Sequence, residues 1–352
     1  MKIEDHGGNI HKYDHPVLDF SANLNPLGTP VSIKHALIEN IDKYEAYPDP
    51  DNVELKLAIG SRHCIEPDRI VCGNGAADII FRIPLALKPK RALIIAPTFS
   101  EYAESLYTSG SDVSYYILKE DDEFFLNINE DIINILQAEP FDIVFICNPN
   151  NPTGLTIERN SMLVLLEACQ LSGARLIVDE CFMDFVHDEK TYSVLPDIHR
   201  FPNLIVLKSF TKIFAMAGIR LGYAICGSIE DCEDINGCLQ TWPVSTVASV
   251  CGIAALSESD FVTRSIDYVA EEKLKLITAL DELGFRTFDS KSNYIFFKSP
   301  VKLDDSLLEN DILIRNCSNY VGLANGFYRI AIRTENENSK LINTLKEIMC
   351  KQ

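Results

Sequence analysis

The sequence predicts an α/β fold with a mostly parallel sheet, because short apolar runs alternate with helical patterns along the middle of the chain. Each run is apolar on both sides, which is typical of strands that are covered on two faces. The clearest helical pattern covers residues 161–172 and stops at Gly173, a common residue after a helix end. The predicted strands are residues 92–96, 143–147, 176–178, 204–207 and 221–225.

The pattern changes after about residue 235, which predicts a second, smaller α+β domain. A long helical pattern over residues 262–283 is followed by short strand patterns at 294–297, 312–315 and 328–333. The loop-rich first thirty residues are expected to pack on this smaller domain. We therefore predict an N-terminal segment (1–30), a large domain (31–235) and a small C-terminal domain (236–352).

The chain is acidic, with 51 Asp and Glu against 32 Lys and Arg and a net charge of -19. Because binding to polyphosphate depends on Lys and Arg, nucleic acid and anionic membranes are not expected partners. No stretch approaches 18 consecutive apolar residues, and the N-terminus lacks the apolar core of a signal peptide. We therefore expect a cytoplasmic protein, in which an anionic substrate needs a local basic pocket.

The eleven cysteines form no CxxC pair, and no Cys/His cluster has zinc-finger spacing. Several lie in apolar strand-like or helix-like runs. We interpret them as buried thiols in a reducing compartment and expect no metal site.

Several segments that follow strands or open helices carry residues suited to ligand chemistry, and such loops converge in open α/β sheets. Gly75 and Ala76 open a helical run, where free backbone N–H groups can hold a phosphate. Asn151 lies in an Asn-Pro loop directly after a strand. Asp179 ends the next strand, where a carboxylate could keep a proton on the ring nitrogen of an electron-sink cofactor. Plain turns, a solvated strand tip or a helix cap are the alternatives.

Lys212 lies in a Ser-x-x-Lys sequence followed by small and apolar residues, which predicts partial burial of its amine. Burial disfavours the ammonium form and favours the free amine needed to form an imine. Ser209 and Arg220 would add donors for a phosphate. A surface charge is the alternative interpretation of the lysine.

Arg329 and Arg333 lie four apart in a strand pattern, so we expect them on the same face as ligands of a carboxylate or phosphate. A solvent-facing strand surface is the alternative. The order of all these features along the chain is more specific than any one of them.

That ordered set resembles the fold-type I pyridoxal-phosphate enzymes, the aspartate aminotransferase superfamily of class I/II aminotransferases, across essentially the whole chain. The resemblance implies that pyridoxal 5′-phosphate is the cofactor and that Lys212 binds it as a Schiff base. Asp179 would pair with the pyridine nitrogen, and Asn151 with the ring hydroxyl. The cofactor phosphate would be held by Gly75, Ala76, Ser209 and Arg220.

The resemblance also implies a homodimer with shared active sites. Phe99 would stack on the cofactor, and Tyr47 would reach the cofactor phosphate of the neighbouring subunit. Arg333 would take the substrate α-carboxylate. One position departs from many aminotransferases: Phe182 stands where a tyrosine usually reaches the ring oxygen, so Asn151 would hold that oxygen without a phenol.

Within the superfamily, the chain is similar to the threonine-phosphate decarboxylases of cobalamin synthesis and to the histidinol-phosphate aminotransferases. The His-Gly-Gly-Asn-Ile sequence at 6–10 and the segments 19–28, 179–185 and 314–323 favour the decarboxylases. His11, however, stands where that family often has an arginine. The implied substrate-binding residues are His6, Asn25, Arg315, Arg329 and Arg333.

The predicted reaction is therefore decarboxylation of L-threonine O-3-phosphate to (R)-1-amino-2-propanol phosphate. Serine phosphate differs by one methyl group, and a pocket distinguishes a methyl by only about 1–3 kcal/mol, so both substrates stay open. Transamination of histidinol phosphate or a related amino acid is the alternative reaction. A non-catalytic protein that retains the fold is a third hypothesis.

Overall fold

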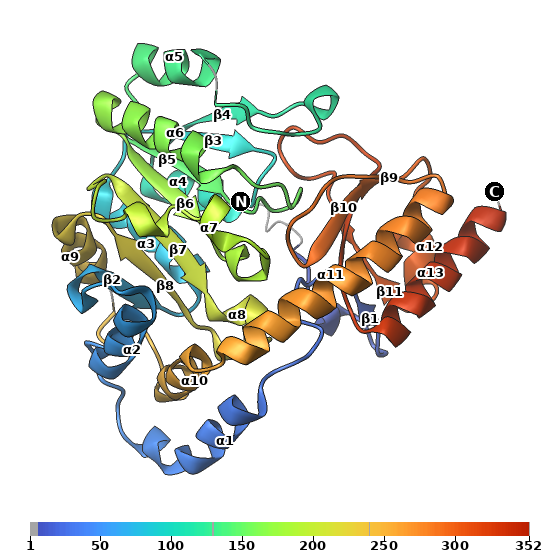
Figure 1. Cartoon of the computed structure of the whole chain (residues 1–352), viewed down its shortest axis with the longest axis horizontal. Coiled ribbons are helices and arrows are strands. Elements are labelled where there is room, and N and C mark those ends of the chain that lie inside the picture. Colours follow the sequence, from blue (N-terminus) through green and yellow to red (C-terminus); the bar gives the residue numbers. More distant parts are fainter. Residues whose placement is uncertain (1–5, 129, 239, 352) are drawn as a thin grey trace.

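The computed structural model describes residues 6–128, 130–238 and 240–351, and a large mixed sheet lies at its centre (Figure 1). In the described residues this sheet has seven strands in the order β2-β8-β7-β6-β5-β3-β4. β8 runs antiparallel to both of its neighbours, and the other neighbouring pairs are parallel. The strands are β2 (Ile70–Gly73), β3 (Arg91–Ala96), β4 (Asp112–Ile117), β5 (Ile143–Cys147), β6 (Arg175–Asp179), β7 (Leu204–Ser209) and β8 (Gly222–Cys226).

The predicted mostly parallel α/β sheet is confirmed, and each of the five predicted strands overlaps an observed one. The sequence analysis missed β2 and β4. β2 has four residues and runs directly into the glycine loop, whereas β4 is only half-buried along most of its length. The apolar run of β2 is therefore very short, and β4 lacks the continuous apolar run that identified the other strands.

Helices cover both faces of this sheet and bury its alternating side chains in two separate cores. One face is covered by α3 (Ala76–Leu87), α4 (Glu101–Ser109) and α9 (Ile229–Gly237). The other is covered by α2 (Val53–His63), α5 (Glu130–Ala138), α6 (Arg159–Ser172) and α10 (Thr246–Leu256). The helix predicted over 161–172 is α6, which ends at Gly173 in the left-handed conformation (φ 80°) that glycine adopts without steric cost.

A smaller antiparallel sheet, in the order β12-β13-β10-β9, lies against the long helix α11 (Ser259–Glu282) and the C-terminal helix α13 (Glu335–Cys350) (Figure 1). Its strands are β9 (Arg286–Thr287), β10 (Tyr294–Lys298), β12 (Arg315–Asn316) and β13 (Phe327–Ala331). The strand pattern predicted over 328–333 is therefore too long. β13 ends at Ala331, so Arg333 lies beyond the strand and does not share its face with Arg329.

Part of the N-terminal segment pairs with a strand near this smaller sheet. β1 (Leu18–Asp19) pairs in parallel with β11 (Ile312–Leu313), close to α12 (Asp304–Leu308). α1 (Val31–Glu39) packs instead on α10, which also packs on α2. Because α10 follows residue 236 yet packs on these earlier helices, the domain limits stay a prediction.

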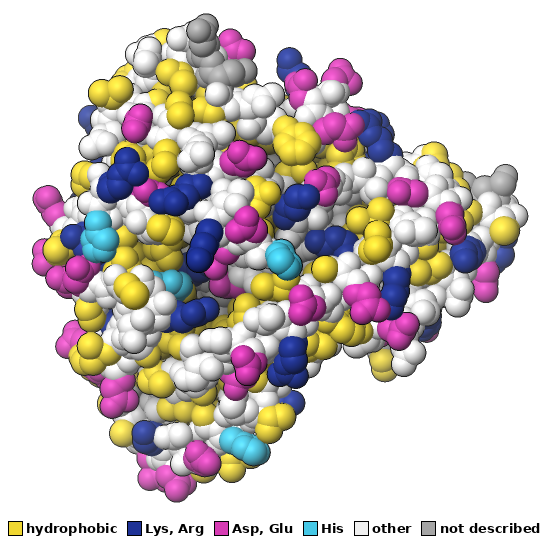
Figure 2. All heavy atoms as spheres, viewed as in Figure 1, with side chains coloured by type: hydrophobic (Ala, Val, Ile, Leu, Met, Phe, Trp, Pro, Cys, Tyr) yellow, Lys and Arg dark blue, Asp and Glu magenta, His cyan; other side chains and the backbone are white. Residues whose placement is uncertain are grey.

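The visible surface carries acidic and basic side chains scattered among each other, with no single basic patch (Figure 2). In the described part of the chain, no helix is both long and apolar enough to cross a membrane. All eleven cysteines are free thiols, and most of them are buried, as the apolar runs around them predict.

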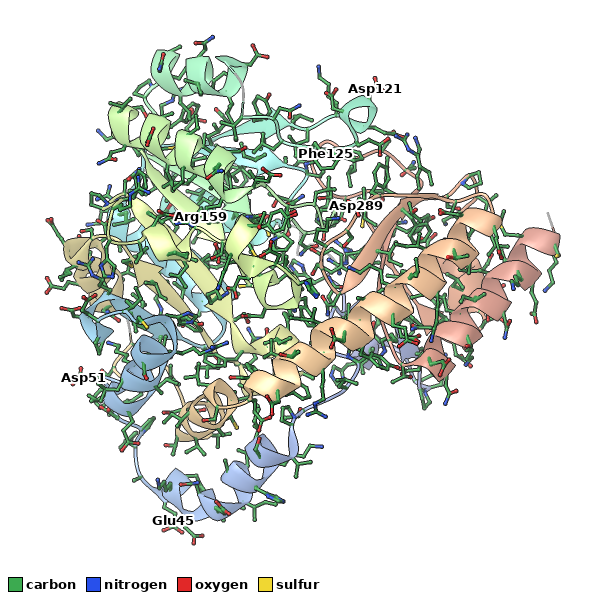
Figure 3. All side chains as sticks on the ribbon, viewed as in Figure 1. Glu45, Asp51, Asp121, Phe125, Arg159 and Asp289 are labelled. Carbon is green, nitrogen blue, oxygen red and sulfur yellow. The ribbon has the colours of Figure 1, made fainter. Side chains whose placement is uncertain are left out.

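An aromatic cluster joins the loop after β4 to the smaller sheet. The Phe124 ring lies 5.3, 5.7 and 5.6 Å from the rings of Phe288, Phe296 and Phe327, in edge-to-face contacts. Phe124 is only 2% exposed, whereas its neighbour Phe125 is 46% exposed (Figure 3). Phe124 therefore anchors a loop of the larger sheet in the core of the smaller one.

The contrast between these neighbours makes the first prediction. We expect Phe124→Ala to lower the free energy of unfolding by about 3–5 kcal/mol, because it leaves a cavity among three aromatic rings. Phe125→Ala is the matched control and should change it by less than about 0.5 kcal/mol. Urea denaturation followed by tryptophan fluorescence measures both, and equal losses in the two variants would contradict the anchoring role.

Candidate active site

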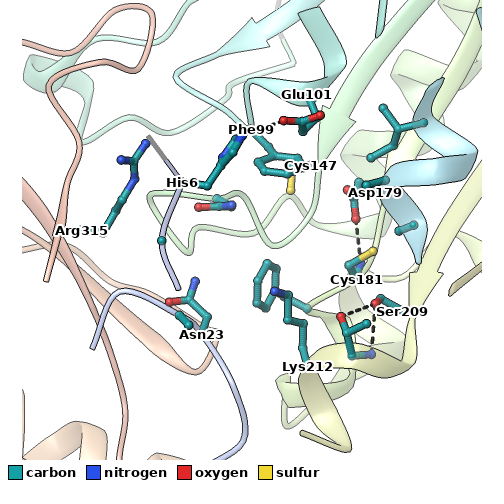
Figure 4. A pocket seen from close by; sticks show the side chains of 18 of the residues that line it. His6, Asn23, Phe99, Glu101, Cys147, Asp179, Cys181, Ser209, Lys212 and Arg315 are labelled. Carbon is teal, nitrogen blue, oxygen red and sulfur yellow. Dashed lines mark hydrogen bonds and ion pairs between the residues drawn. The ribbon is translucent and has the colours of Figure 1, made fainter. Parts of the chain in front are cut away.

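A cavity of about 420 Å³ lies where the carboxyl ends of β5, β6 and β7 face the smaller sheet. The parallel strands bring together loops that are far apart in the sequence, as expected for an open α/β sheet. Most of the predicted site residues line this cavity, including Lys212, Asp179, Asn151 and Phe99 (Figure 4).

Lys212 is placed by α8 (Phe210–Ile213), a short helix that begins directly after β7. The Ser209 side chain caps this helix: its Oγ accepts a hydrogen bond from the Thr211 backbone N–H at 3.2 Å. The Lys212 Nζ lies 5.8 Å from the centre of the Phe182 ring. Burial, followed by the positive charges of Arg329 and Arg220, lowers the pKa of Lys212 to about 8. About a tenth of the amine is therefore free at pH 7, and about half is free at pH 8.

Asp179 ends β6 and is 5% exposed. Its carboxylate accepts hydrogen bonds from the Tyr102 hydroxyl at 2.6 Å and from the Cys181 backbone N–H at 2.9 Å. These two donors fix the carboxylate at the cavity wall. The sequence analysis gave Tyr102 no role. Its position three residues after Phe99 was the available signal, because residues at that spacing share a side where a helix begins.

Asn151 and Arg329 contact each other at the cavity. The Asn151 Oδ1 accepts a hydrogen bond from Arg329 Nη1 and lies 3.5 Å from the Tyr320 hydroxyl. Arg329 Nη2 donates to the Ser21 carbonyl at 2.7 Å, but its Nε has no hydrogen-bond partner in the described part of the chain. Arg329 is only 5% exposed, and a buried guanidinium is costly unless an anion compensates its charge. Arg329 is therefore suited to bind a carboxylate.

The N-terminus of α3 and the Arg220 side chain form a second anion-binding end. Gly75 precedes α3 with φ 83°, and a Cβ at this position would lie 2.5 Å from Arg220 Nη2. Glycine is therefore needed for the close approach of the guanidinium, although Gly75 itself does not line the cavity. Ala76, Ser209, Thr211 and Arg220 do line it, which brings backbone N–H, hydroxyl and guanidinium donors together as a phosphate requires.

His6 and Arg315 lie close together at the end of the cavity away from Asp179 (Figure 4). The His6 Nε2 is 2.7 Å from the Glu101 carboxylate, and its ring lies 5.9 Å from the Phe99 ring. Arg315 is 8% exposed and lies over the Tyr320 ring at 5.2 Å. Glu101 and Tyr320 were not among the predicted site residues. Tyr320 belongs to one of the segments that carry the resemblance, which was the available signal.

Two predicted substrate residues lie outside the cavity. The Arg333 guanidinium pairs with Glu337 at 2.7 Å in the first turn of α13, so Arg329 occupies the place expected for Arg333. The Asn25 Nδ2 donates to the Ile213 carbonyl at 2.6 Å, and its backbone N–H donates to the Lys212 carbonyl at 3.1 Å. Asn25 therefore holds the Lys212 loop instead of facing a ligand.

Tyr47 also lies outside the cavity of its own chain. It is 79% exposed and stacks on Trp242, with ring centres 4.2 Å apart. An exposed aromatic pair at this place is compatible with the predicted reach into a neighbouring subunit, which stays a prediction.

Comparisons with known proteins agree with this architecture. The family model for aminotransferase class I and II matches residues 15–345. The chain is 35% identical to threonine-phosphate decarboxylase of Salmonella typhimurium, over 98% of this chain and 96% of that protein. It is 30% identical to histidinol-phosphate aminotransferase of Ruminiclostridium cellulolyticum, over 94% and 92%. The crystal structure of histidinol-phosphate aminotransferase from Clostridium acetobutylicum matches with a TM-score of 0.89 and 32% identity, over 96% and 100%. The chain belongs to the aminotransferase class I and II family.

Proposed function

We propose that this chain is a pyridoxal-phosphate-dependent lyase that decarboxylates L-threonine O-3-phosphate to (R)-1-amino-2-propanol phosphate, a reaction of cobalamin synthesis. The observation that carries this choice is the 35% identity to a threonine-phosphate decarboxylase along nearly the whole of both chains. The position of His6 at the basic end of the cavity supports it, because His6 belongs to the N-terminal sequence that favours the decarboxylases.

The residues of the cavity fit pyridoxal phosphate. A volume of about 420 Å³ lies within the usual range for small-molecule sites. Ala76, Ser209 and Arg220 would hold its phosphate, and Asp179 its pyridine nitrogen. The Asn151 oxygen is engaged by Arg329, so the Asn151 amide N–H would donate to the ring hydroxyl. Lys212, with its lowered pKa, supplies the amine for covalent attachment.

When bound, pyridoxal phosphate supplies an electron sink for the electrons of a bond broken at the substrate Cα. Decarboxylation breaks the bond between Cα and the carboxylate, releases CO₂ and places a proton on Cα. Arg329, which lines the cavity, would orient the carboxylate with its guanidinium, and Asp179 would keep a proton on the pyridine nitrogen. Lys212 can hold and deliver the proton that Cα receives, because its pKa of about 8 allows both protonation states near neutral pH.

The substrate phosphate would bind at the opposite end, near His6 and Arg315. This local basic site offsets the overall charge of -19, which disfavours an anionic substrate. It also places the phosphate far from the end that Arg220 and Ala76 provide for the cofactor, so each phosphate has its own site.

We further propose that the enzyme is a cytoplasmic homodimer with shared active sites. α1 and the segments beside α10 expose large apolar side chains, which soluble monomers rarely gather in one patch. The exposed side chains include Ile38, Ile41, Tyr44, Tyr47, Trp242 and Val247. Eleven free thiols fit a reducing compartment.

A direct assay separates the two reactions. We expect the purified protein, loaded with pyridoxal phosphate, to release CO₂ from O-phospho-L-threonine with no oxo-acid present. Measured CO₂ release and mass detection of aminopropanol phosphate give the result. Conversion of histidinol phosphate that requires 2-oxoglutarate, without CO₂ release from phosphothreonine, would instead establish the aminotransferase.

The two strand-region arginines make a matched pair of variants. We expect Arg329→Gln to lower kcat/KM by about 10²-fold or more, or ~3 kcal/mol, because it removes a buried ligand of the carboxylate. Arg333→Gln should keep KM within about threefold, since its guanidinium pairs with Glu337 outside the cavity. Steady-state kinetics measure both variants. A larger loss of kcat/KM from Arg333→Gln than from Arg329→Gln would support the prediction that Arg333 takes the substrate carboxylate.

The pKa of Lys212 predicts how the apoprotein takes up its cofactor. Burial lowers this pKa from 10.5 to about 8, so the fraction of free amine rises steeply with pH below about 8 and levels off above about 9. The rate at which the visible absorption appears should therefore rise about tenfold from pH 6 to 7 and become flat above pH 9. Lys212→Ala should show no borohydride-sensitive absorption. A rate that still climbs steeply above pH 9 would mean an ordinary lysine.

A further inference from the structure

Lys208 is a buried cation behind the cavity that the reaction above does not use. It lies on β7 and is 1% exposed. Because side chains alternate along a strand, Lys208 points to the same face as Leu204 and Val206, which belong to an apolar core. An ammonium group at such a core position needs compensating charges.

Three carboxylates, all from the segment that follows β6, surround this ammonium. The Lys208 Nζ lies 3.2 Å from Glu189 Oε1, 3.4 Å from Asp184 Oδ1 and 3.9 Å from Glu180 Oε2. Glu180 is fully buried, whereas the Asp184 and Glu189 side chains are 27% and 44% exposed. The single ammonium of Lys208 therefore faces three carboxylates of this segment.

That segment forms part of the cavity wall. It begins directly after Asp179 and carries Cys181 and Phe182, which line the cavity. Its far end is held by Glu180, whose carboxylate accepts hydrogen bonds from the Ser193 hydroxyl at 2.8 Å and the Val194 backbone N–H at 2.9 Å.

Lys208 also immediately precedes Ser209, the residue that caps the short helix carrying Lys212. One buried ammonium thus connects the strand that leads to Lys212 with the segment that leads away from Asp179. These two residues would lie at the two reactive positions of the cofactor.

The other charged or titratable groups near this cluster come from α2 and β8. The His63 Nε2 lies 2.7 Å from the Tyr223 hydroxyl, and burial, followed by the charge of Lys208, lowers the pKa of His63 to about 3. His63 is therefore neutral. Arg62 is the further cation whose charge acts on Glu189. Burial raises the pKa of Glu180 to about 7, and Lys208 opposes that rise.

We propose that Lys208 is a positioning residue, whose buried ammonium holds segment 180–193 against β7 and so sets Asp179 and Phe182 relative to Lys212. Without the ammonium, the three acids repel one another, and the segment relaxes away from the strand. The proposal rests on the proposed function in one respect, namely that the cavity binds pyridoxal phosphate.

The test compares Lys208→Met with the double variant Lys208→Met/Glu180→Gln and with Lys190→Met, which removes an exposed lysine of α7 (Glu189–Tyr192). Titration of each apoprotein with pyridoxal phosphate gives a dissociation constant, and the visible spectrum reports the cofactor environment. We expect Lys208→Met to bind the cofactor about tenfold or more weakly at pH 8. The double variant should recover most of that loss, and Lys190→Met should match the wild type.

The dependence on pH separates charge from packing. The defect of Lys208→Met should shrink towards pH 6 and grow towards pH 9, because protons on Glu180 and its neighbours replace the missing charge only at low pH. A Lys208→Met protein with wild-type affinity and spectrum from pH 6 to 9 would overturn the proposal. A defect that is equal at every pH and unchanged by Glu180→Gln would also overturn it.

Two further outcomes are distinguishable. Where Lys208→Met does not fold, the double variant decides: near wild-type affinity supports the charge role, and failure to fold overturns it. A wild-type protein that binds no pyridoxal phosphate would refute the proposed function instead.

Discussion

The parallel pairing of β5, β6 and β7 is the constraint on which the site depends. In this register Cys147 lies opposite Asp179, and Asp179 lies opposite Leu207. The Asn-Pro loop and the Lys212 helix begin within a few residues of these positions, so their functional groups meet at one edge of the sheet. Because parallel strands all end on the same side, their pairing brings Asn151, Asp179 and Lys212 to one edge of the sheet.

Burial then changes the charge states and the pairing needs of the groups at the cavity. An acidic chain keeps several of its cations buried near the cavity, among them Arg315 and Arg329. Arg329 retains an unpartnered Nε, and the positive charges around Lys212 join burial in lowering its pKa. The same low-dielectric surroundings make an unpaired acid costly, which is why Lys208 matters for segment 180–193.

The smaller sheet completes the cavity from parts of the chain that are distant in sequence. Arg329 and Arg315 come from β13 and β12, and His6 comes from the N-terminal segment that pairs with this part through β1. The Phe124 cluster fixes the smaller sheet to a loop of the larger one. The substrate end of the cavity therefore depends on how the two sheets pack, whereas the cofactor end depends mainly on the larger sheet.

The order of motifs along the chain was enough to predict the mostly parallel sheet, the family and a set of residues that line the cavity: Lys212, Asp179, Asn151, Ser209 and Arg220. Asp179 and Ser209 end strands, Asn151 and Lys212 follow strands closely, and Arg220 lies just before β8, so local patterns were enough to identify them. Arg333 and Asn25 do not line the cavity, because their places depend on where β13 ends and on which partners the tertiary packing supplies, so their contacts with substrate stay a prediction.

Tyr102, Glu101 and Tyr320 line the cavity but were not predicted from the sequence. The nearness of Tyr102 and Glu101 to Phe99 in the sequence indicates a place at the site, but it does not show that Tyr102 donates to Asp179 or that Glu101 pairs with His6. Short-range residue patterns set the motifs that follow β5, β6 and β7, so the order of these motifs along the chain determined the fold and the cofactor end of the cavity. Contacts between residues far apart in the sequence follow from packing alone, so only the tertiary structure decided that Arg329, and not Arg333, lines the cavity.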